Sequence, residues 1–323
     1  MKNKRNPEVV ITALICFGLI MMVLWVYYGA FFGVKTPTKK KDISVVLYDA
    51  GEGGWQSLME GMKQAEEDFA VNIHYVTAKS GTTGEEQGEL VQQEIDGGAA
   101  GILFASADAS MIPPVLQGGS LQVPIVAVES NVDAATYSFF SADNVDMGRR
   151  LGQAVLEDFE GKENLKIVVV EEFIERDSVR ERMQGVYEVL EDKAELIPLQ
   201  RNNDRTELTM LLSNVLIRTE ADAVVALCKE SLDALCRVEP RSVSDKKIYG
   251  IGNTAAIVAA LEKGKIEKLV FQDEFNIGYM SVKALVQQME GIQSRAEEID
   301  YYCVNGKEVH ETQYERLLFP IVE

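Results

Sequence analysis

Polar and aromatic residues follow the ends of several short apolar segments, and their types suit the binding of a small polar molecule. An aromatic ring packs against C–H groups, whereas carboxylate, amide and guanidinium groups form paired hydrogen bonds with hydroxyl groups. No nucleophile stands with a base and an orienting partner, so we expect a binding protein and no enzyme activity. The candidate binding residues are Tyr48, Trp55, Asp108, Glu129, Asp143, Arg180 and Gln272.

The segments around these residues predict the elements that position them. Continuous apolar runs alternate with helical patterns such as residues 56–69 and 145–159, which is typical of parallel strands covered on both faces. Two successive series predict an α/β fold of two doubly wound lobes joined by a hinge. Ligands collect at the carboxyl ends of such strands. The expected strands are residues 43–48, 72–78, 101–105, 124–128, 166–170, 223–227, 247–251 and 269–272, with a small terminal hairpin at 301–309.

Several of the candidate residues also have a structural interpretation that the sequence leaves open. Trp55 can pack in the core at the start of a helix, and Gln272 can cap a strand end. Arg180 can be a solvated helix arginine, and Glu129 can pair with a surface lysine. We expect ligand contact from these four residues, and the alternatives stand beside that expectation.

Two carboxylates and two thiols favour structural roles. Asp108 and Asp143 each precede a helical pattern, where an N-cap is the commoner role for aspartate. Cys228 and Cys236 are eight residues apart, which matches neither C-x-x-C nor zinc spacing and indicates buried, unpaired thiols. With two histidines in the chain, we expect no metal and no other cofactor.

Length and composition bound the function. The chain has 323 residues, of which 46% are hydrophobic and 26% charged, so it is an ordinary globular chain long enough for about two domains. Its net charge of −19 argues against a nucleic-acid partner, because phosphate contacts need clustered Lys and Arg.

The N-terminal segment differs from the rest. Seven basic residues against one acid give residues 1–41 a net charge of +6, which leaves −25 for the remainder. Residues 9–34 carry no charge and exceed the about 20 apolar residues that a bilayer needs, so we expect a transmembrane anchor followed by a linker at 35–41. A cleaved signal peptide fits less well, because its apolar region usually has about 7–15 residues. Cys16 lacks the small preceding residue of a lipoprotein anchor.

One motif indicates a different class of protein. Residues 250–255 fit the dinucleotide-binding pattern G-x-G-x-x-A after a strand, and Asp273 follows Gly252 by 21 residues. The pattern stands late in the chain rather than at the start of the fold, and no hydride-transfer site accompanies it. A dinucleotide-binding enzyme is therefore the remote alternative.

The order and spacing of several segments together resemble a known family. They resemble the type I periplasmic binding proteins of the ribose/galactose sugar-binding group, over residues 42–322. The segments that carry the resemblance are residues 51–69, 141–144, 180–185, 249–254 and 269–272. The resemblance implies a ligand cleft between two hinged lobes that close on a sugar-like molecule.

Residue roles follow from this resemblance by position. Trp55 matches the aromatic that stacks on the ligand, and Glu129 stands where the family often has an aspartate for hydroxyl groups. Arg180 and Gln272 match ligand-contacting positions. Lys229 departs from the pattern, because Cys-Lys replaces an asparagine-aspartate pair there.

These observations predict a membrane-anchored, extracytoplasmic solute-binding protein at the cell membrane. It would close on a small polar ligand, a carbohydrate, and deliver it to the permease of an ABC-type sugar importer. The alternative is a sensory role, in which it signals to a membrane histidine kinase. We expect an N-terminal lobe of residues 42–142 with about 274–300, and a C-terminal lobe of 143–273 with about 301–323.

Overall fold

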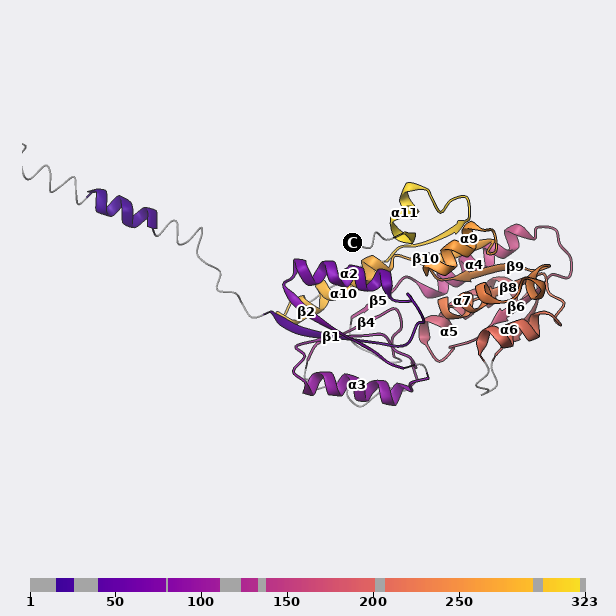
Figure 1. Ribbon diagram of the computed structural model, residues 1–323, viewed down its shortest axis with the longest axis horizontal. Coiled ribbons are helices and arrows are strands. Elements are labelled where there is room, and N and C mark those ends of the chain that lie inside the picture. Colours follow the sequence, from indigo (N-terminus) through magenta and orange to yellow (C-terminus); the bar gives the residue numbers. More distant parts are fainter. Residues whose placement is uncertain are drawn as a thin grey trace, which may run out of the picture. The chain divides into compact units, whose positions relative to one another are not determined.

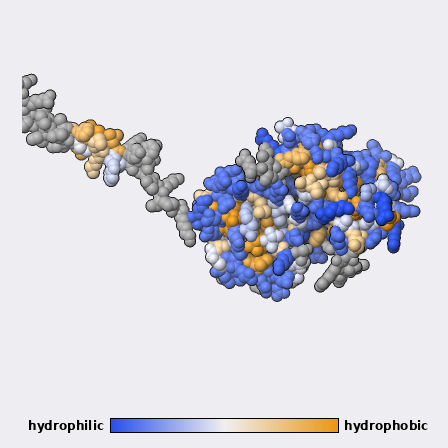
Figure 2. All heavy atoms as spheres, viewed as in Figure 1, coloured by the Kyte–Doolittle hydropathy of each residue, from blue (hydrophilic) through white to orange (hydrophobic). Residues whose placement is uncertain are grey.

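The computed structural model describes residues 16–25, 40–79, 81–110, 123–132, 138–200, 207–292 and 299–319. The chain divides into two compact units, Met1–Lys40 and Lys41–Glu323. Both sheets belong to the second unit, and the face of this unit seen in Figure 2 is mostly hydrophilic.

In the first unit, residues 16–25 form a helix whose large apolar side chains, among them Trp25, are exposed (Figure 2). Within the described ranges, no helix is both long enough and apolar enough to cross a bilayer. The other residues of the predicted anchor, 9–15 and 26–34, and residues 35–39 of the predicted linker lie outside the described residues.

The first sheet has five parallel strands in the order β2-β1-β3-β4-β5. Helices α2 (Gln56–Asp68) and α10 (Glu274–Met289) pack together over one face, and α3 (Gly84–Asp96) covers the other (Figure 1). Helix α10 thus returns to this sheet from the far end of the sequence. The strands are β1 (Lys41–Leu47), β2 (Val71–Thr77), β3 (Ile102–Phe104), β4 (Ile125–Val128) and β5 (Ser138–Phe140).

Two glycines let α2 and α10 approach closely. A Cβ atom at Gly61 would lie 1.9 Å from the carbonyl oxygen of Phe275, and one at Gly278 would lie 2.1 Å from that of Leu58. Both distances are far below van der Waals contact, so side chains there would push the helices apart. The close packing holds α2 in place, and with it Trp55, the residue that precedes the helix.

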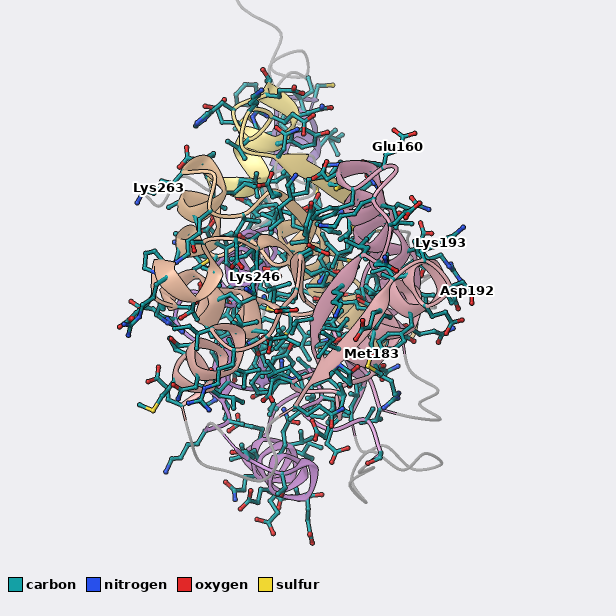
Figure 3. All side chains as sticks on the ribbon, turned by 90° about the vertical axis from the view of Figure 1, so that its right-hand side faces the viewer. Glu160, Met183, Asp192, Lys193, Lys246 and Lys263 are labelled. Carbon is teal, nitrogen blue, oxygen red and sulfur yellow. The ribbon has the colours of Figure 1, made fainter. Side chains whose placement is uncertain are left out.

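The second sheet has six strands in the order β11-β10-β9-β8-β6-β7, and β11 runs antiparallel to β10. Successive residues of β6 point to opposite faces. Val169 packs with α4 and α5 in one core, whereas Val168 packs with α6, α7 and α9 in another. Charged side chains such as Glu160, Asp192 and Lys193 point outward (Figure 3). The elements are β6 (Lys166–Val170), β7 (Glu195–Leu199), β8 (Ala223–Ala226), β9 (Lys247–Ile251), β10 (Lys268–Gln272), β11 (Tyr301–Asn305), α4 (Asn144–Asp158), α5 (Asp177–Leu190), α6 (Leu208–Leu216), α7 (Lys229–Arg237), α8 (Pro240–Val243), α9 (Ala255–Glu262) and α11 (Thr312–Leu318).

The predicted α/β fold of two lobes with parallel sheets is confirmed. The eight predicted strands are all present, with ends that differ by at most two residues. Strands β5 and β7 were not predicted: β5 has three residues, and β7 is an edge strand that contains Pro198 and is only partly buried. Neither segment therefore has the continuous apolar pattern of a central strand.

The predicted terminal hairpin at residues 301–309 is wrong. Strand β11 pairs with β10 instead of with the residues that follow it. Beyond β11 the chain turns towards α11, and the turn is closed by two hydrogen bonds: the Asn305 N–H donates to the Glu308 carboxylate (2.8 Å) and the Glu308 N–H to the Asn305 carbonyl (3.1 Å). The Asn305-Gly306 pair does turn the chain, but β11 extends the sheet beyond β10 and is its edge strand.

Candidate ligand-binding seam between the two sheets

Residues that follow the strands of both sheets meet in a region that we call the seam, lined chiefly by Glu129, Arg182, Lys229, Gln272 and Glu274. Each of these five residues is at most 6% exposed, although four are charged. The side chains leave a space of about 10 Å³, room for about one water molecule. The seam is therefore a buried cluster of charges that fills its own volume.

Glu129 is the centre of the seam. It follows β4 with a positive φ of 59°, and its carboxylate accepts hydrogen bonds from the Tyr48 hydroxyl and from Nη2 of Arg182 (2.9 Å). Burial alone would raise the pKa of Glu129, but Arg182, Lys229 and the Tyr48 hydroxyl outweigh it and hold this pKa below the ordinary value. Glu129 therefore stays ionised inside the protein.

Arg182, on α5, joins the second sheet to the first. Besides its contact with Glu129, its Nε donates to Oδ1 of Asn144 (2.8 Å). The sequence pointed to Arg180, which the structure places on α5 with partial exposure and not among the residues that line the seam. Helical spacing explains the difference, because Ser178 and Arg182 are four residues apart on the buried face. The apolar residues at 179 and 186, seven positions apart, indicate this buried face in the sequence.

Lys229, the first residue of α7, makes the second connection across the seam. Its ammonium donates to the Glu274 carboxylate (2.7 Å) and to the carbonyl of Gly54. It also lies 4.8 Å from the centre of the Trp55 ring. The predicted stacking residue thus has a cation from the second sheet against it, and its Nε1 donates to the Tyr48 carbonyl (2.8 Å).

Beside the seam lies a larger cavity of about 580 Å³, which we call the side cavity. It is bordered by residues after β1, β2 and β3 of the first sheet and by the loop after β6 of the second. Its volume falls in the range of about 300–1,000 Å³ found for small-molecule sites. The lining residues are Tyr48, Asp49, Ala78, Lys79, Gly81, Thr82, Thr83, Ala107, Asp108, Phe173, Glu175 and Arg176.

Arg176 borders the side cavity, and Tyr48, over whose ring it lies, links this cavity to Glu129 of the seam. Its guanidinium lies 3.7 Å from the centre of the Tyr48 ring and 4.5 Å from that of Phe173, and it forms an ion pair with Glu230. A ligand in the cavity would meet aromatic rings, hydroxyl groups and carboxylates together. Two predicted residues, Tyr48 and Asp108, border this cavity.

The two predicted N-caps have different outcomes. Asp143 caps α4 through a hydrogen bond from the Asp146 N–H (2.9 Å), so the structural interpretation is confirmed. Oδ1 of Asp108 accepts hydrogen bonds from the N–H and hydroxyl of Ser110 (2.9 and 2.7 Å). Whether Asp108 caps a helix stays a prediction, because the residues that follow, 111–122, lie outside the described residues.

Gln272 borders the seam and holds the chain where it crosses between the sheets. Its Oε1 accepts hydrogen bonds from the Ala142 N–H (3.1 Å) and the Ser141 hydroxyl (3.3 Å). These residues directly precede α4, and Gln272 itself ends β10. This contact therefore connects two segments in which the chain passes between the sheets, the one before α4 and the one after β10.

The dinucleotide pattern has structural roles here. Asp273 accepts a hydrogen bond from the Asn276 N–H (3.0 Å) and caps α10. Gly252 has a φ of 154°, and a Cβ atom there would lie 2.9 Å from Cβ of Lys229. The glycine and the acid thus serve close packing and a helix start.

Cysteine roles follow the sequence prediction in part. Cys228 is buried, which raises its pKa to about 12, and Cys236 is partly buried; neither forms a disulfide. Among the residues that the structure describes, no group of three or more His, Cys, Asp or Glu side chains could hold a metal ion.

Residues 43–293 match the family model for the periplasmic binding protein domain, so the chain belongs to this family. Its fold is that of the type I periplasmic sugar-binding proteins. No curated protein matches the chain.

Solved structures agree with this family in fold. A carbohydrate transporter solute-binding protein of Agrobacterium radiobacter, in complex with D-arabinose, is 18% identical, with a TM-score of 0.78 over 87% of this chain and 99% of that one. An ABC transporter solute-binding protein of Agrobacterium vitis, bound to α-D-tagatopyranose, is 15% identical, with a TM-score of 0.77 over 87% and 100%. A chain of the XylFII–LytSN complex is 15% identical, with a TM-score of 0.69 over 83% and 99%. At these identities the likeness concerns the fold.

Proposed function

We propose that the chain is an extracytoplasmic solute-binding protein whose two lobes close on a small, hydroxyl-rich ligand, a carbohydrate. The observation that carries the proposal is the meeting of buried, charged residues from both sheets at the carboxyl ends of their strands. We take the lobes to be residues 42–142 with 274–300 and residues 143–273 with 301–323. Membership of the periplasmic binding protein family supports this reading.

Closure would work as a two-state hinge. In the closed state, Arg182 of one lobe pairs with Glu129 of the other, and Lys229 pairs with Glu274. The ligand would lie in the side cavity, where both lobes contribute to the lining. Because a ligand there touches both lobes at once, it binds the closed state more tightly and shifts the population towards it.

Among the predicted residues, we assign the ligand to Tyr48 and Asp108 in the side cavity. Trp55, Glu129 and Gln272 would not contact the ligand directly but would stabilise the closed seam. As ligand contacts, Arg180 and Asp143 stay predictions: Arg180 lies on α5, Asp143 caps α4, and neither borders the cavity. Residues with the right chemistry that the sequence reading did not select are Phe173, Glu175 and Arg176.

A partner protein would read the closed state. The permease of an ABC-type sugar importer is one candidate, and the two Agrobacterium transporter proteins of the same fold support it. A membrane sensor such as a histidine kinase is the other, and the complex of XylFII with LytSN supports a partner of some kind for a protein of this fold. Genes for a permease and an ATPase beside this one would favour import, and kinase and regulator genes would favour sensing.

Anchoring is part of the proposal. The uncharged segment at residues 9–34 is long enough to span a bilayer, and basic residues flank it on both sides. The full-length chain is expected to stay with the membrane fraction after alkaline washing, whereas Lys41–Glu323 alone is expected in the soluble fraction. Release of the full-length chain by the same washing would reject the anchor.

A thermal-shift screen tests ligand binding. The unit Lys41–Glu323 contains both sheets with their cores, so it suits measurement by itself. A panel of monosaccharides and polyols should contain at least one compound that raises its Tm, because a ligand stabilises the state that it binds. Asp108→Asn should reduce that shift, and Asp192→Asn, on the outer surface, should leave it unchanged. A panel without any stabilising compound would contradict a carbohydrate ligand.

A further inference from the structure

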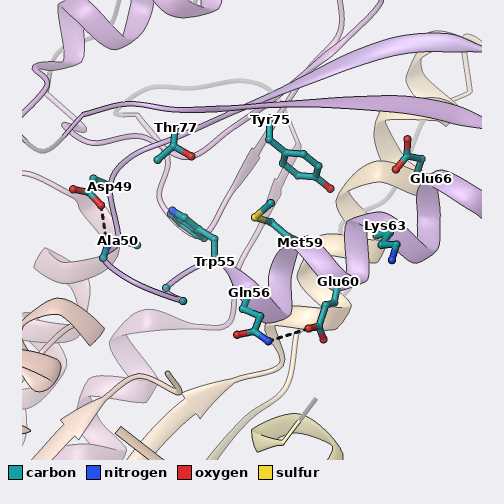
Figure 4. A pocket seen from close by; sticks show the side chains of 13 residues that line it. Asp49, Ala50, Trp55, Gln56, Met59, Glu60, Lys63, Glu66, Tyr75 and Thr77 are labelled. Atoms are coloured by element: carbon teal, nitrogen blue, oxygen red, sulfur yellow. Dashed lines mark hydrogen bonds between the residues drawn. The ribbon is translucent and has the colours of Figure 1, made fainter. Parts of the chain in front are cut away.

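A second large cavity lies in the first lobe, and its lining residues Gly54 and Trp55 also contact Lys229 of the seam. It has a volume of about 600 Å³ and is bordered by residues 49–54, helix α2 and the edge strand β2 (Figure 4). We call it the α2–β2 groove. Because its lining comes only from the first lobe, we expect the cavity in the open state as well as in the closed one. It shares Asp49 with the side cavity and Trp55 with the contacts of the seam, but the proposed function places no ligand in it.

The floor of the groove is apolar and aromatic. Trp55 and Met59 enter from the start of α2, and Tyr75 enters from β2 opposite them (Figure 4). Indole and phenol rings attract cations through their π faces, and a methionine thioether packs well against aromatic groups. A flat or apolar molecular body would fit between these three side chains.

The rim of the groove is acidic. Asp49, Glu60 and Glu66 border it, against Lys63 as the cation, so the charged lining has a net charge of −2. One of these carboxylates already has a partner within the protein, because Glu66 accepts a hydrogen bond from the Ile73 N–H (3.1 Å). Figure 4 shows the Glu60 carboxylate hydrogen-bonded to the Gln56 amide (3.3 Å) and the Glu66 carboxylate further along α2. The rim favours a positive charge at the mouth of the cavity.

The Tyr75 hydroxyl is an unusual feature of the groove. Its oxygen is buried and has no hydrogen-bond partner among the residues that the structure describes. Buried polar groups in proteins are nearly always paired, so the Tyr75 hydroxyl has capacity for a further hydrogen bond, which a ligand of the groove would supply. Burial, with a smaller contribution from Glu66, raises the pKa of Tyr75 to about 12, so the hydroxyl stays neutral, and its oxygen can accept a hydrogen bond from a cation.

We propose that the α2–β2 groove binds a small organic cation with an aromatic or apolar body, at a site separate from the sugar cleft. The body lies against Trp55, Met59 and Tyr75, and the ammonium group faces Glu60 and Glu66. The same indole touches Lys229 of the seam, with Nζ 4.8 Å from the ring centre. An occupant of the groove therefore contacts a residue that also contacts the opposite lobe.

Tryptophan fluorescence of Lys41–Glu323 tests the site. The chain has two tryptophans, Trp25 and Trp55, so this unit retains Trp55 alone and its emission reports on the groove. The probes are 2-phenylethylamine, 2-phenylethanol and phenylacetate, which share one ring and differ in charge. We expect saturable binding of the amine, at least tenfold weaker binding of the alcohol, and no saturation with the acid. Equal binding of all three, or binding of the acid in preference to the amine, would overturn the proposal.

Two variants locate the probe. Glu60→Gln removes one negative charge from the rim and should weaken amine binding about three- to tenfold. Glu89→Gln makes the same charge change at an exposed position of α3 and should not alter it. Met59→Lys places a cation in the floor and should abolish binding, and an unchanged Tm in each variant confirms folding. If Glu60→Gln and Met59→Lys bind the amine as the wild type does, the groove is not the site.

Discussion

The seam and the α2–β2 groove differ in how their buried polar groups are paired. In the seam, Glu129, Arg182, Lys229 and Glu274 are almost completely buried, and each charge has a partner from the opposite lobe. The space that remains is about 10 Å³. The groove has about 600 Å³, few buried charges and one hydroxyl that has no partner among the described residues. Internal pairing therefore suits a contact between lobes, whereas open volume with unsatisfied chemistry suits a ligand.

The comparison predicts that the seam, more than the groove, carries stability. Arg182→Ala should lower the free energy of unfolding by about 3–5 kcal/mol, because it leaves the Glu129 carboxylate buried without its cation. Urea unfolding of Lys41–Glu323 measures the loss. The control is Arg149→Ala, whose side chain is 41% exposed in its pair with Glu188 and should have little effect. A loss no larger than that of the control would show that the seam does not hold the lobes together.

A second prediction concerns the pair of Lys229 and Glu274. Lys229→Met should cost about 3 kcal/mol, because Glu274 stays buried and unpaired. Glu274→Gln in the same chain should restore part of that loss, since the uncompensated charge is then gone. A double-mutant cycle by urea unfolding measures the coupling. Strictly additive effects would mean that the two groups do not interact across the seam.

The fold was largely predictable from the sequence, and particular residues show why. Strands such as β6 and β9 are largely apolar runs, because helices cover the sheet on both faces and bury the side chains of both. The start of α4 was equally readable, because an N-cap such as Asp143 acts on residues three positions away. These elements depend on interactions between residues that are close in the sequence, so sequence patterns are enough to predict them.

The seam was harder to predict because its contacts are long-range. Glu129 and Arg182 lie 53 positions apart, and Lys229 and Glu274 lie 45 apart. Which side chains meet depends on how two sheets approach each other, which no local pattern specifies. Arg180 and Arg182 differ by two positions on one helix, so the choice between them depends on helical phase. The groove, in which Tyr75 lies on an edge strand, was not predicted by any sequence pattern.

A third prediction uses pH to distinguish the seam from the rest of the protein. The pKa of Glu129 is lower in the folded state than in the unfolded chain, where it is about 4.3. Its contribution to stability is therefore complete above that value and is lost as the pH falls through the lower, folded pKa. Glu129→Gln should have a lower Tm at pH 7 and a smaller decrease in Tm on acidification. Parallel Tm curves of wild type and variant between pH 7 and 2.5 would contradict this.

The smallest expected effects come from a matched pair of tyrosines. Tyr48 donates its hydroxyl to the Glu129 carboxylate in the seam, whereas the Tyr75 hydroxyl in the groove has no described partner. Tyr48→Phe should therefore cost about 1.5–3 kcal/mol, the value of a hydrogen bond to a charged group. Tyr75→Phe should leave the free energy of unfolding unchanged or raise it by up to about 1 kcal/mol, because it removes an unpaired polar group. Urea unfolding of both variants compares the two regions by the same chemical change, the loss of one oxygen atom. If Tyr75→Phe were as destabilising as Tyr48→Phe, the Tyr75 hydroxyl would have a partner in solution, and the contrast between a paired seam and an unpaired groove would not hold.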